Sequence, residues 1–424
     1  MSAQVHAVIS PERSFAEAPT FAPTRLADRS EWLDALRGFA LLGILVYNMM
    51  TFSGYVFRSV LPPVQHAWSA LDPSLDYLVH ALVEGKFYSL FSFLFGLGFA
   101  LQMRRAEALG GEALSALRRR LVWLLVFGLA HALLIWFGDI LTVYALFGFV
   151  LLLWFRHMSQ RALLAWAVSF LTLPVLIYLV FLAFHMSDPL GGPATPGATG
   201  ESLLGKAVRA MATGSYVDVL QTNALFYPGG WLRRAVRLML PRIFGMFLLG
   251  MWVCRIGLPV LRDTQRPMLR RWLLWGVLLG LPLNAAYAAL GSGGALLPAS
   301  ATGLLVIVSA SLGIPLLCLA YVAAFALFWR RSRPDNLLVT AGRTALSQYL
   351  AQSIVCVTLF YGIGFGLFGQ LSYGVALAIA IAVYVVLAWL SRLWLRSHAQ
   401  GPMEALWRRL SYSAAAASER AAAR

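Results

Sequence analysis

A long apolar segment bounded by arginines constrains the fold of this chain more than any other feature. It runs from Arg118 to Arg156 and consists of two apolar halves that meet at Phe137-Gly138-Asp139. Each half is about 17 residues long, or roughly 25 Å as a helix, which suffices for most of a bilayer core. Arginines favour the membrane surface over its interior. The segment therefore predicts a hairpin of two transmembrane helices.

The composition extends this conclusion to the whole chain. Hydrophobic residues make up 60% and charged residues only 12% of the sequence, and the mean hydropathy is +0.72, unlike an ordinary soluble domain. The net charge of +16 is almost all arginine, which in a membrane protein marks cytoplasmic loops, so nucleic-acid binding is not expected. Cys254, Cys318 and Cys356 lack metal-ligand spacing and are expected to pack in the interior. We expect an all-α, polytopic transmembrane helix bundle.

The apolar runs predict about ten spans. They lie near residues 38–57, 87–103, both halves of 118–156, 162–184, 238–256, 272–290, 301–328, 337–361 and 373–395. Residues 1–30 are expected to be a disordered cytoplasmic segment, 31–396 the helix bundle, and 397–424 a basic cytoplasmic tail. Residues 58–84 read as a loop, and 185–235 as a long outer loop that begins with a Gly/Pro-rich linker. With the N-terminus inside, the arginine-rich short loops face the cytoplasm, so both termini are predicted to be cytoplasmic.

His131 and Asp139 are the ionisable residues inside the apolar hairpin. An ionisable side chain at membrane depth costs several kcal/mol, which makes both of them candidates for catalysis. The alternatives are a histidine that is hydrogen-bonded between helices and an aspartate that caps the second helix. On one straight helix the two would lie about 12 Å apart along the axis. They can meet only if the hinge at Gly138 folds Asp139 back, or if a substrate bridges them.

Further polar residues lie at the ends of the first two spans. Asp34 and Arg37 are three residues apart at the start of the first, so they can neutralise each other or together hold a phosphate or carboxylate. Glu84 and Lys86 lie at the opposite end of the second span, where Lys86 can line a substrate path or extend to the membrane surface.

The ninth predicted span carries a polar stripe. Thr344, Gln348 and Gln352 recur every four residues, with Arg343 beside them. Such a row is expected to face the bundle interior, where it can either join helices or line a polar cavity. The glycines of 362–366 lack the lysine and strand context of a phosphate loop and fit the end of a span or a re-entrant turn.

Motifs throughout the chain also resemble a known family. They are Leu33-Asp34-Ala-Leu-Arg37-Gly38, Gly85-Lys86-Phe, Gly128-Leu-Ala-His131, Trp136-Phe-Gly138-Asp139-Ile-Leu-x-x-Tyr144, Gly342-Arg343-Thr-Ala-Leu-x-x-Tyr349-Leu-x-Gln352-Ser, Phe360-Tyr361 and Gly401-Pro402-x-Glu404-x-x-Trp407. In this order, across residues 30–412, they resemble the YeiB family of bacterial inner-membrane proteins. The resemblance adds Tyr144 and Tyr361 to the candidate substrate-lining residues.

The YeiB family is similar to a broader superfamily of transmembrane acyltransferases, which includes the heparan glucosaminide N-acetyltransferase and the acyltransferase-three enzymes. That similarity implies a bundle that passes an acyl group from cytoplasmic acyl-CoA to an acceptor in or across the membrane. The catalytic histidine of the sugar N-acetyltransferases lies between spans one and two in a His-x-x-Trp-x-Gly context. Neither His66 nor His80 has that context here, so the role is transferred to His131.

These observations predict an integral-membrane acyltransferase. His131 would act as the base with Asp139 beside it, since histidine is suited to accepting a proton near neutral pH. The resemblance implies acyl-CoA, in particular acetyl-CoA, as the donor, with Arg37 and Asp34 at its site. The acceptor would be a small molecule or saccharide with a hydroxyl or amine. No metal and no nucleic acid are expected. The expected partner is the lipid bilayer of the bacterial inner membrane, and the sequence is compatible with an oligomer. A transporter or permease, and a structural membrane partner, are the alternatives.

Overall fold

The computed structural model describes residues 30–58, 61, 69–109, 111–184, 203–228, 233–258, 263–291, 300–329 and 336–422. These residues form helices, turns and short connections, and no β-strand occurs in these ranges. The predicted all-α fold is confirmed. The predictions for the N-terminal segment up to residue 29 and for the Gly/Pro-rich linker after residue 184 lie outside the described residues.

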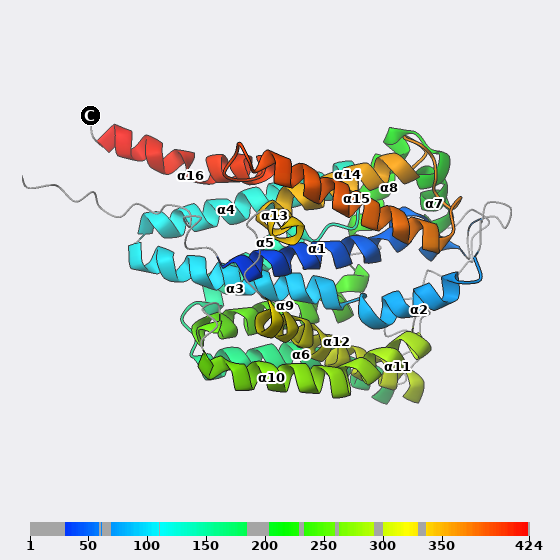
Figure 1. Cartoon of the computed structure of the whole chain (residues 1–424), viewed down its shortest axis with the longest axis horizontal. Helices are drawn as coiled ribbons and strands as arrows, with labels where there is room; N and C mark the ends of the chain where they lie inside the picture. Colours follow the sequence, from blue (N-terminus) through cyan, green and yellow to red (C-terminus); the bar gives the residue numbers. More distant parts are fainter. Residues whose placement is uncertain are drawn as a thin grey trace, which may run out of the picture.

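The helices run roughly along the long axis of the molecule (Figure 1). The first half of the chain contains α1 (Glu31–Phe52), α2 (Asp72–Leu82), α3 (Lys86–Leu109), α4 (Gly111–Ala130), α5 (Leu141–Val150), α6 (Gln160–Ala183), α7 (Leu203–Thr213) and α8 (Tyr216–Phe226). The second half contains α9 (Arg233–Arg255), α10 (Arg266–Trp275), α11 (Leu281–Gly291), α12 (Ala301–Phe328), α13 (Leu337–Arg343), α14 (Ala345–Phe360), α15 (Tyr373–Trp394) and α16 (Pro402–Ala422).

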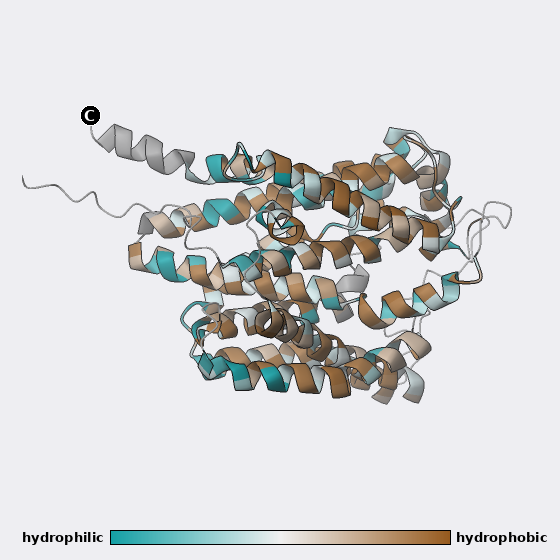
Figure 2. Ribbon diagram, viewed as in Figure 1, coloured by the Kyte–Doolittle hydropathy of each residue, from teal (hydrophilic) through white to brown (hydrophobic). Residues whose placement is uncertain are grey.

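Six helical stretches among the described residues are long and apolar enough to cross a membrane. They are Glu31–Phe57, Asp72–Leu109, Gln160–Ala183, Asp263–Gly291, Ala301–Phe328 and Tyr373–Trp394. Apolar residues cover most of the helix lengths, and hydrophilic ones gather mainly at the end where α16 lies (Figure 2). The chain is therefore a multi-pass membrane protein. The other predicted spans coincide with α4, α5, α9 and α13–α14, and the count of ten stays a prediction.

Glycines allow the closest helix contacts. A Cβ atom at Gly96 of α3 would overlap the carbonyl of Phe247, and one at Gly250 of α9 would overlap that of Phe93. Small residues let backbones approach in membranes, where the hydrophobic effect does not drive helix association. α1 and α13 meet in the same way, because a Cβ at Gly342 would overlap the carbonyl of Asp34.

The prediction of a loop over residues 58–84 is wrong for its second half, which forms α2. Pro73 at the start of this helix was read as a loop residue, yet proline suits the first turn, where its missing N–H has no partner in any case. Gly85, with φ of 80°, makes the turn into α3. The buried face of α2 carries Asp72, Asp76 and His80.

The predicted ninth span is interrupted and does not form one helix. Thr344, with φ −112° and ψ 36°, separates α13 from α14. By contrast, Pro174, Pro241 and Pro315 lie inside α6, α9 and α12, whose helices continue through them.

The long loop predicted after the fifth span contains two helices, α7 and α8. They lie at the end of the molecule opposite α16 (Figure 1). Ser215 starts α8 with a capping box, in which its hydroxyl and the Asp218 side chain bond each other's backbone N–H groups. The Gly362 N–H donates to the Met211 carbonyl at 2.9 Å, which joins α7 to the turn after α14.

Candidate active site

The hinge of the apolar hairpin brings Asp139 back to His131. α4 continues into a π-helical turn over His131–Ile135, and Trp136 is then extended, with φ −157° and ψ 128°. The chain reverses within the next few residues, and the Asp139 Oδ1 lies 3.0 Å from the His131 Nδ1. The Asp139 Oδ2 accepts a hydrogen bond of 2.8 Å from the Thr142 N–H. Asp139 is thus both a helix cap and the partner of the histidine, the two roles that the sequence left open.

A serine from a distant helix completes the arrangement. The Ser353 Oγ of α14 lies 2.9 Å from the His131 Nε2. The three side chains are deeply buried, with exposed fractions of 0% for Asp139, 1% for His131 and 2% for Ser353. The sequence did not single out Ser353, because a serine in an apolar helix is ordinary and its neighbour Gln352 belonged to a more visible pattern. Ser353 is the last residue of the Gly342–Ser353 motif, but only the packing of α14 against the hairpin shows its contact with His131.

The hydrogen-bond pattern assigns the protons. The Asp139 carboxylate can only accept, so the Nδ1 of His131 carries the hydrogen and its Nε2 is the acceptor. The Ser353 hydroxyl has two acceptors within reach, the Nε2 of a neutral His131 at 2.9 Å and the Tyr349 carbonyl oxygen at 3.3 Å. An acid that orients a histidine, which in turn accepts from a hydroxyl, is the arrangement that activates a nucleophile.

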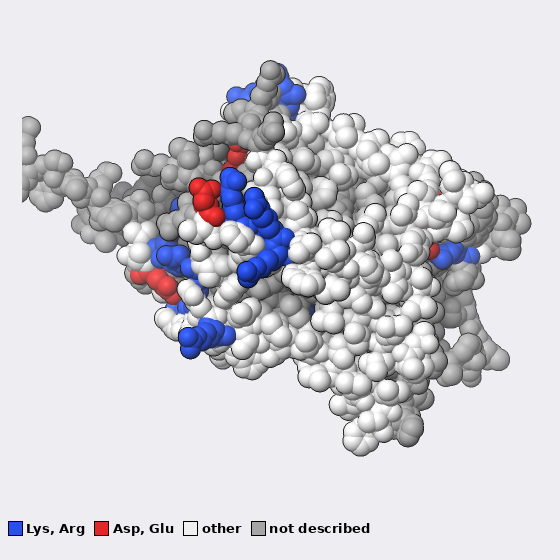
Figure 3. All heavy atoms as spheres, turned by 60° about the horizontal axis from the view of Figure 1, so that its bottom comes forward, with Lys and Arg blue, Asp and Glu red and all other residues white. Residues whose placement is uncertain are grey.

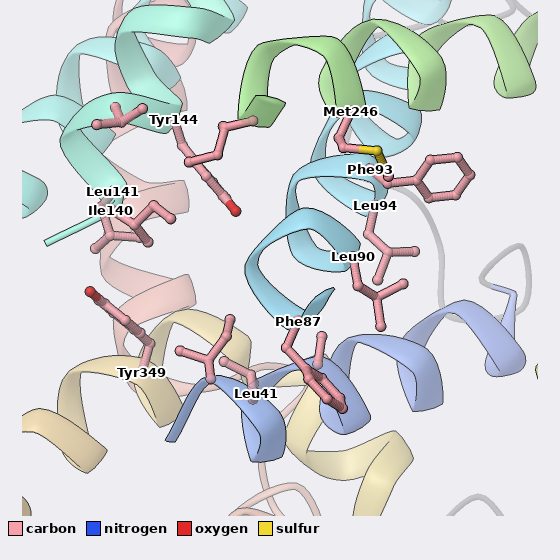
Figure 4. Packing of buried hydrophobic residues seen from close by; sticks show 14 of the residues in the cluster. Leu41, Phe87, Leu90, Phe93, Leu94, Ile140, Leu141, Tyr144, Met246 and Tyr349 are labelled. Carbon is pink, nitrogen blue, oxygen red and sulfur yellow. The ribbon is translucent and has the colours of Figure 1, made fainter. Parts of the chain in front are cut away.

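Aromatic rings and helix α8 enclose this Asp139–His131–Ser353 triad. The ring of Tyr349 lies 4.9 Å from that of His131, and the ring of Trp136 is edge-on at 6.4 Å. Figure 4 shows Tyr349 in the packed core together with Ile140 and Leu141, which follow Asp139 in the chain. Burial among apolar groups strengthens hydrogen bonds inside the site.

The π-helical turn is stabilised from α8. A π turn shifts the backbone hydrogen-bond register, and side chains of α8 bond two of its carbonyl groups. The Tyr216 hydroxyl donates to the Leu134 carbonyl at 2.8 Å, and the Asn223 amide donates to the Leu133 carbonyl at 3.3 Å. The helices of the predicted outer loop thus contribute directly to the geometry at His131.

One buried polar atom next to the triad in the chain lacks a protein partner. The side chains of Trp136 and Tyr361 interact with each other, as do those of Thr142 and Tyr227, but the Gln352 Nε2 has no hydrogen bond to another described residue. Gln352 adjoins Ser353. Buried polar groups in native proteins are usually satisfied, so an unpaired one indicates a water or a ligand. Within the described ranges, no cluster of three or more His, Cys, Asp or Glu residues could hold a metal ion.

The other predicted site residues do not join the triad. Arg37 is hydrogen-bonded to Asp34, as one alternative had it. Gln348 donates to the Ser391 hydroxyl at 2.8 Å and so joins α14 to α15, while Arg343 donates to the Ala399 carbonyl at 3.4 Å.

Tyr144 belongs to a hydroxyl cluster between α3 and α5. Its hydroxyl lies 2.8 Å from the Ser92 Oγ and 3.1 Å from the Tyr88 carbonyl oxygen. The polar stripe of Thr344, Gln348 and Gln352 is buried, as predicted.

Lys86 lies in a second buried polar group and does not extend to the surface. Its side chain is fully buried, and Nζ donates to the His80 carbonyl at 2.7 Å. The His80 Nδ1 lies 2.8 Å from the Asp76 carbonyl oxygen and 3.4 Å from Asp76 Oδ1, and its Nε2 lies 3.7 Å from Glu84 Oε2. We call Asp76, His80, Glu84 and Lys86 the α2–α3 ionisable row. The sequence analysis singled out Glu84 and Lys86 but did not place Asp76 and His80 beside them, because α2 was read as a loop.

These features define a class of protein, a polytopic helical membrane protein with a buried Asp–His–Ser triad. Residues 253–414 match a family model described as a protein of unknown function (DUF418). The chain is 34% identical over 405 residues to the uncharacterized protein YxaH of Bacillus subtilis (strain 168), covering 92% of this chain and 96% of that protein. It is 28% identical over 430 residues to the uncharacterized protein YeiB of Escherichia coli (strain K12), with 92% and 97% covered. The chain belongs to the YeiB family, as its motifs indicated.

Proposed function

We propose that this protein is an integral-membrane acyltransferase whose nucleophile is Ser353. The observation that carries the proposal is the hydrogen-bonded order Asp139–His131–Ser353, buried at the turn of an apolar hairpin. Here the histidine is fixed at both ring nitrogens, and its free acceptor faces a hydroxyl.

The reaction has two balanced halves. In the first, the Ser353 Oγ attacks the carbonyl carbon of an acyl thioester and its proton passes to the His131 Nε2. The thioester C–S bond breaks, and the leaving thiolate of coenzyme A takes that proton to become the free thiol. In the second, an acceptor hydroxyl or amine attacks the acyl-serine ester and gives its proton to Nε2, and Ser353 recovers a proton as the ester bond breaks.

Asp139 supports both halves without exchanging a proton. Its carboxylate holds the ring of His131 in one orientation and stabilises the imidazolium that forms in each half. Proton transfer by a positioned side chain contributes about 100- to 10,000-fold to a rate. The Gln352 Nε2, unpaired among the described residues and next to Ser353 in the chain, is a candidate for binding the acyl or acceptor group.

The test is release of free coenzyme A from acetyl-CoA by purified protein supplied with bacterial membrane extract as the source of acceptor. We expect release by the wild-type protein and a loss of at least about 100-fold in Ser353→Ala. Cys356→Ala, a change of similar size one turn further along the same helix, is the matched control and is expected to retain activity. Equal turnover in Ser353→Ala and the wild type would contradict the proposal.

A second candidate function is proton-coupled transport of a small molecule. The observation that favours it is the α2–α3 ionisable row within a candidate span, because buried titratable residues in membranes mark proton and ion paths. Proton flux in liposomes that contain the purified protein tests it. A flux that His80→Phe abolishes and Ser353→Ala leaves intact would favour transport over acyl transfer.

We further propose that the protein lies in the bacterial inner membrane with both termini in the cytoplasm. The Lys and Arg side chains on the face shown in Figure 3 gather mainly at one end, which supports a single cytoplasmic side. Reporter fusions after residues 110 and 260 are expected to be cytoplasmic, and those after 195 and 295 periplasmic. A periplasmic signal at 110 or 260 would contradict this topology.

A further inference from the structure

A cleft with a volume of about 430 Å³ opens between the ends of three helices. Its lining residues come from the last turns of α3 and α9 and from the connection between α5 and α6. They are Arg104, Glu107, Arg156, Ser159, Gln160 and Arg255. Three arginines and one acid leave a formal excess of two positive charges at the cleft.

The arginines of the cleft are not equivalent. Arg255 donates to the Arg156 carbonyl at 2.7 Å and to the Met158 carbonyl, so its guanidinium fixes the connection between α5 and α6. Arg156 is half-buried and makes no side-chain hydrogen bond or ion pair with another described residue. Glu107 lines the same cleft but forms no ion pair with Arg156, so this half-buried guanidinium keeps its donors for an added anion.

The start of α6 adds to the attraction for anions. Ser159 caps this helix by accepting from the Ala162 N–H at 3.2 Å, and Gln160 is its first residue. The helix is 24 residues long, and the positive end of its dipole borders the cleft. Guanidinium groups and a helix N-terminus around one cleft match the oxygens of phosphate groups.

The cleft is one helix length from the triad. α5 and the π-helical turn after it, Leu141–Phe155, begin two residues after Asp139 and end next to Arg156. Fifteen residues of helix span about 22 Å. A ligand that uses both sites must therefore be long, with phosphates at one end and its reactive group at the other.

We propose that this cleft binds the phosphate groups of a soluble nucleotide-like anion, and that Arg156 is its main ligand. Naming coenzyme A as that anion rests on the proposed function, whereas anion binding itself does not. Arg37, which the sequence suggested for this role, is bonded to Asp34 and does not line the cleft.

Calorimetric titration of the purified full-length protein with coenzyme A and with 3′,5′-adenosine bisphosphate tests the inference. We expect both to bind, and Arg156→Gln to weaken each by about 10- to 150-fold, because a charge-assisted hydrogen bond contributes about 1.5–3 kcal/mol. Arg271→Gln, on the exposed face of α10, makes the same change of charge away from the cleft and is expected to bind like the wild type.

Three outcomes would overturn the inference. Equal weakening by Arg156→Gln and Arg271→Gln would show general attraction to a basic surface. Wild-type affinity in Arg156→Gln would show that the cleft does not bind the anion. Failure of both soluble probes, with phosphatidylglycerol vesicles binding the wild type but not Arg156→Gln, would assign the cleft to a lipid headgroup. A further outcome separates the two proposals. If Ser353→Ala binds the nucleotide like the wild type and neither protein releases coenzyme A, the acyltransferase proposal is contradicted, but the anion site in the cleft is supported.

Discussion

The triad and the α2–α3 ionisable row both bury ionisable side chains, but they differ in how completely these are paired. At the triad both nitrogens of His131 have partners within 3.0 Å, and both Asp139 oxygens accept hydrogen bonds. In the row the nearest partner of His80 is the Asp76 carbonyl oxygen, at 2.8 Å, and the carboxylate oxygens of Asp76 and Glu84 that face the ring lie farther away, at 3.4 and 3.7 Å.

This difference separates two uses of a buried charge. Catalysis needs groups held in their reactive geometry before the substrate arrives, which the fully bonded triad provides. Loosely paired carboxylates around a histidine can change protonation or bind a cation with little rearrangement, but they do not fix a nucleophile. Under the proposed function, we therefore assign covalent chemistry to the triad, and stability or charge movement to the row.

The largest expected effect is on activity, and it distinguishes the role of His131 from that of Asp139. His131→Ala is expected to reduce coenzyme A release by at least about 100-fold, because the base is lost. Asp139→Asn keeps a capping oxygen for the Thr142 N–H but removes the charge that stabilises the imidazolium. It is expected to lower turnover while the apparent melting temperature stays close to that of the wild type. Unchanged turnover in Asp139→Asn would reduce Asp139 to a helix cap.

The next effect tests the packing that holds the hairpin closed. A Cβ at Gly128 would overlap the backbone nitrogen of Thr142, so Gly128→Ala is expected to cost about 1–3 kcal/mol by overpacking and to lower activity. Gly98→Ala is the matched control, since its Cβ would meet only the Arg37 side chain, at 3.6 Å. Thermal unfolding in detergent measures both. Equal melting temperatures for Gly128→Ala and Gly98→Ala would show that α4 and α5 can move apart without loss of stability.

A smaller and different effect is expected in the row. Glu84→Gln keeps an acceptor for the Tyr47 hydroxyl, which lies at 3.0 Å, but removes a negative charge near Lys86. We expect a lower melting temperature with coenzyme A release within about threefold of wild type, or less than about 1 kcal/mol in the barrier. A loss of release as large as that in His131→Ala would reverse the assignment of the two regions.

The smallest effect concerns α16, which joins both helices of the triad. Glu404 accepts from the backbone N–H groups of Leu346 and Ser347 at the start of α14, at 2.7 and 3.2 Å. On the same helix, Trp407 donates to the Arg120 carbonyl of α4 at 2.8 Å.

Burial raises the pKa of the Glu404 carboxyl above its usual value of 4.5. The folded protein therefore binds this proton more tightly than the unfolded chain does, and stability falls as pH rises from the usual to the raised pKa. Glu404→Gln is expected to lose this slope and about 1 kcal/mol of hydrogen bonding. Melting temperatures across that pH range measure it, and parallel curves for the two proteins would contradict the assignment.

Features set by local composition could be predicted from the sequence. The apolar runs predicted the hairpin and its hinge at Gly138. Spacing along a helix predicted the pair of Asp34 and Arg37 and the burial of the polar stripe. Ser353 could not, because its contact with His131 joins residues 222 positions apart and depends on how α14 packs.

Irregular backbone was the other feature that could not be predicted from the sequence. The π-helical turn after Ala130 and the break at Thr344 change the direction of the chain without any glycine or proline at those positions. α2 was missed because Pro73 indicates either a loop or the first turn of a helix, and the neighbouring helices decide between them.

Mass spectrometry of the purified protein after incubation with acetyl-CoA, without acceptor, tests the central claim most directly. The account predicts one acetyl group on the peptide that contains Ser353, absent in Ser353→Ala, strongly reduced in His131→Ala, and removed when membrane extract is added. Consumption of acetyl-CoA at the wild-type rate by Ser353→Ala, or acetyl groups on other residues with Ser353 unmodified, would contradict it.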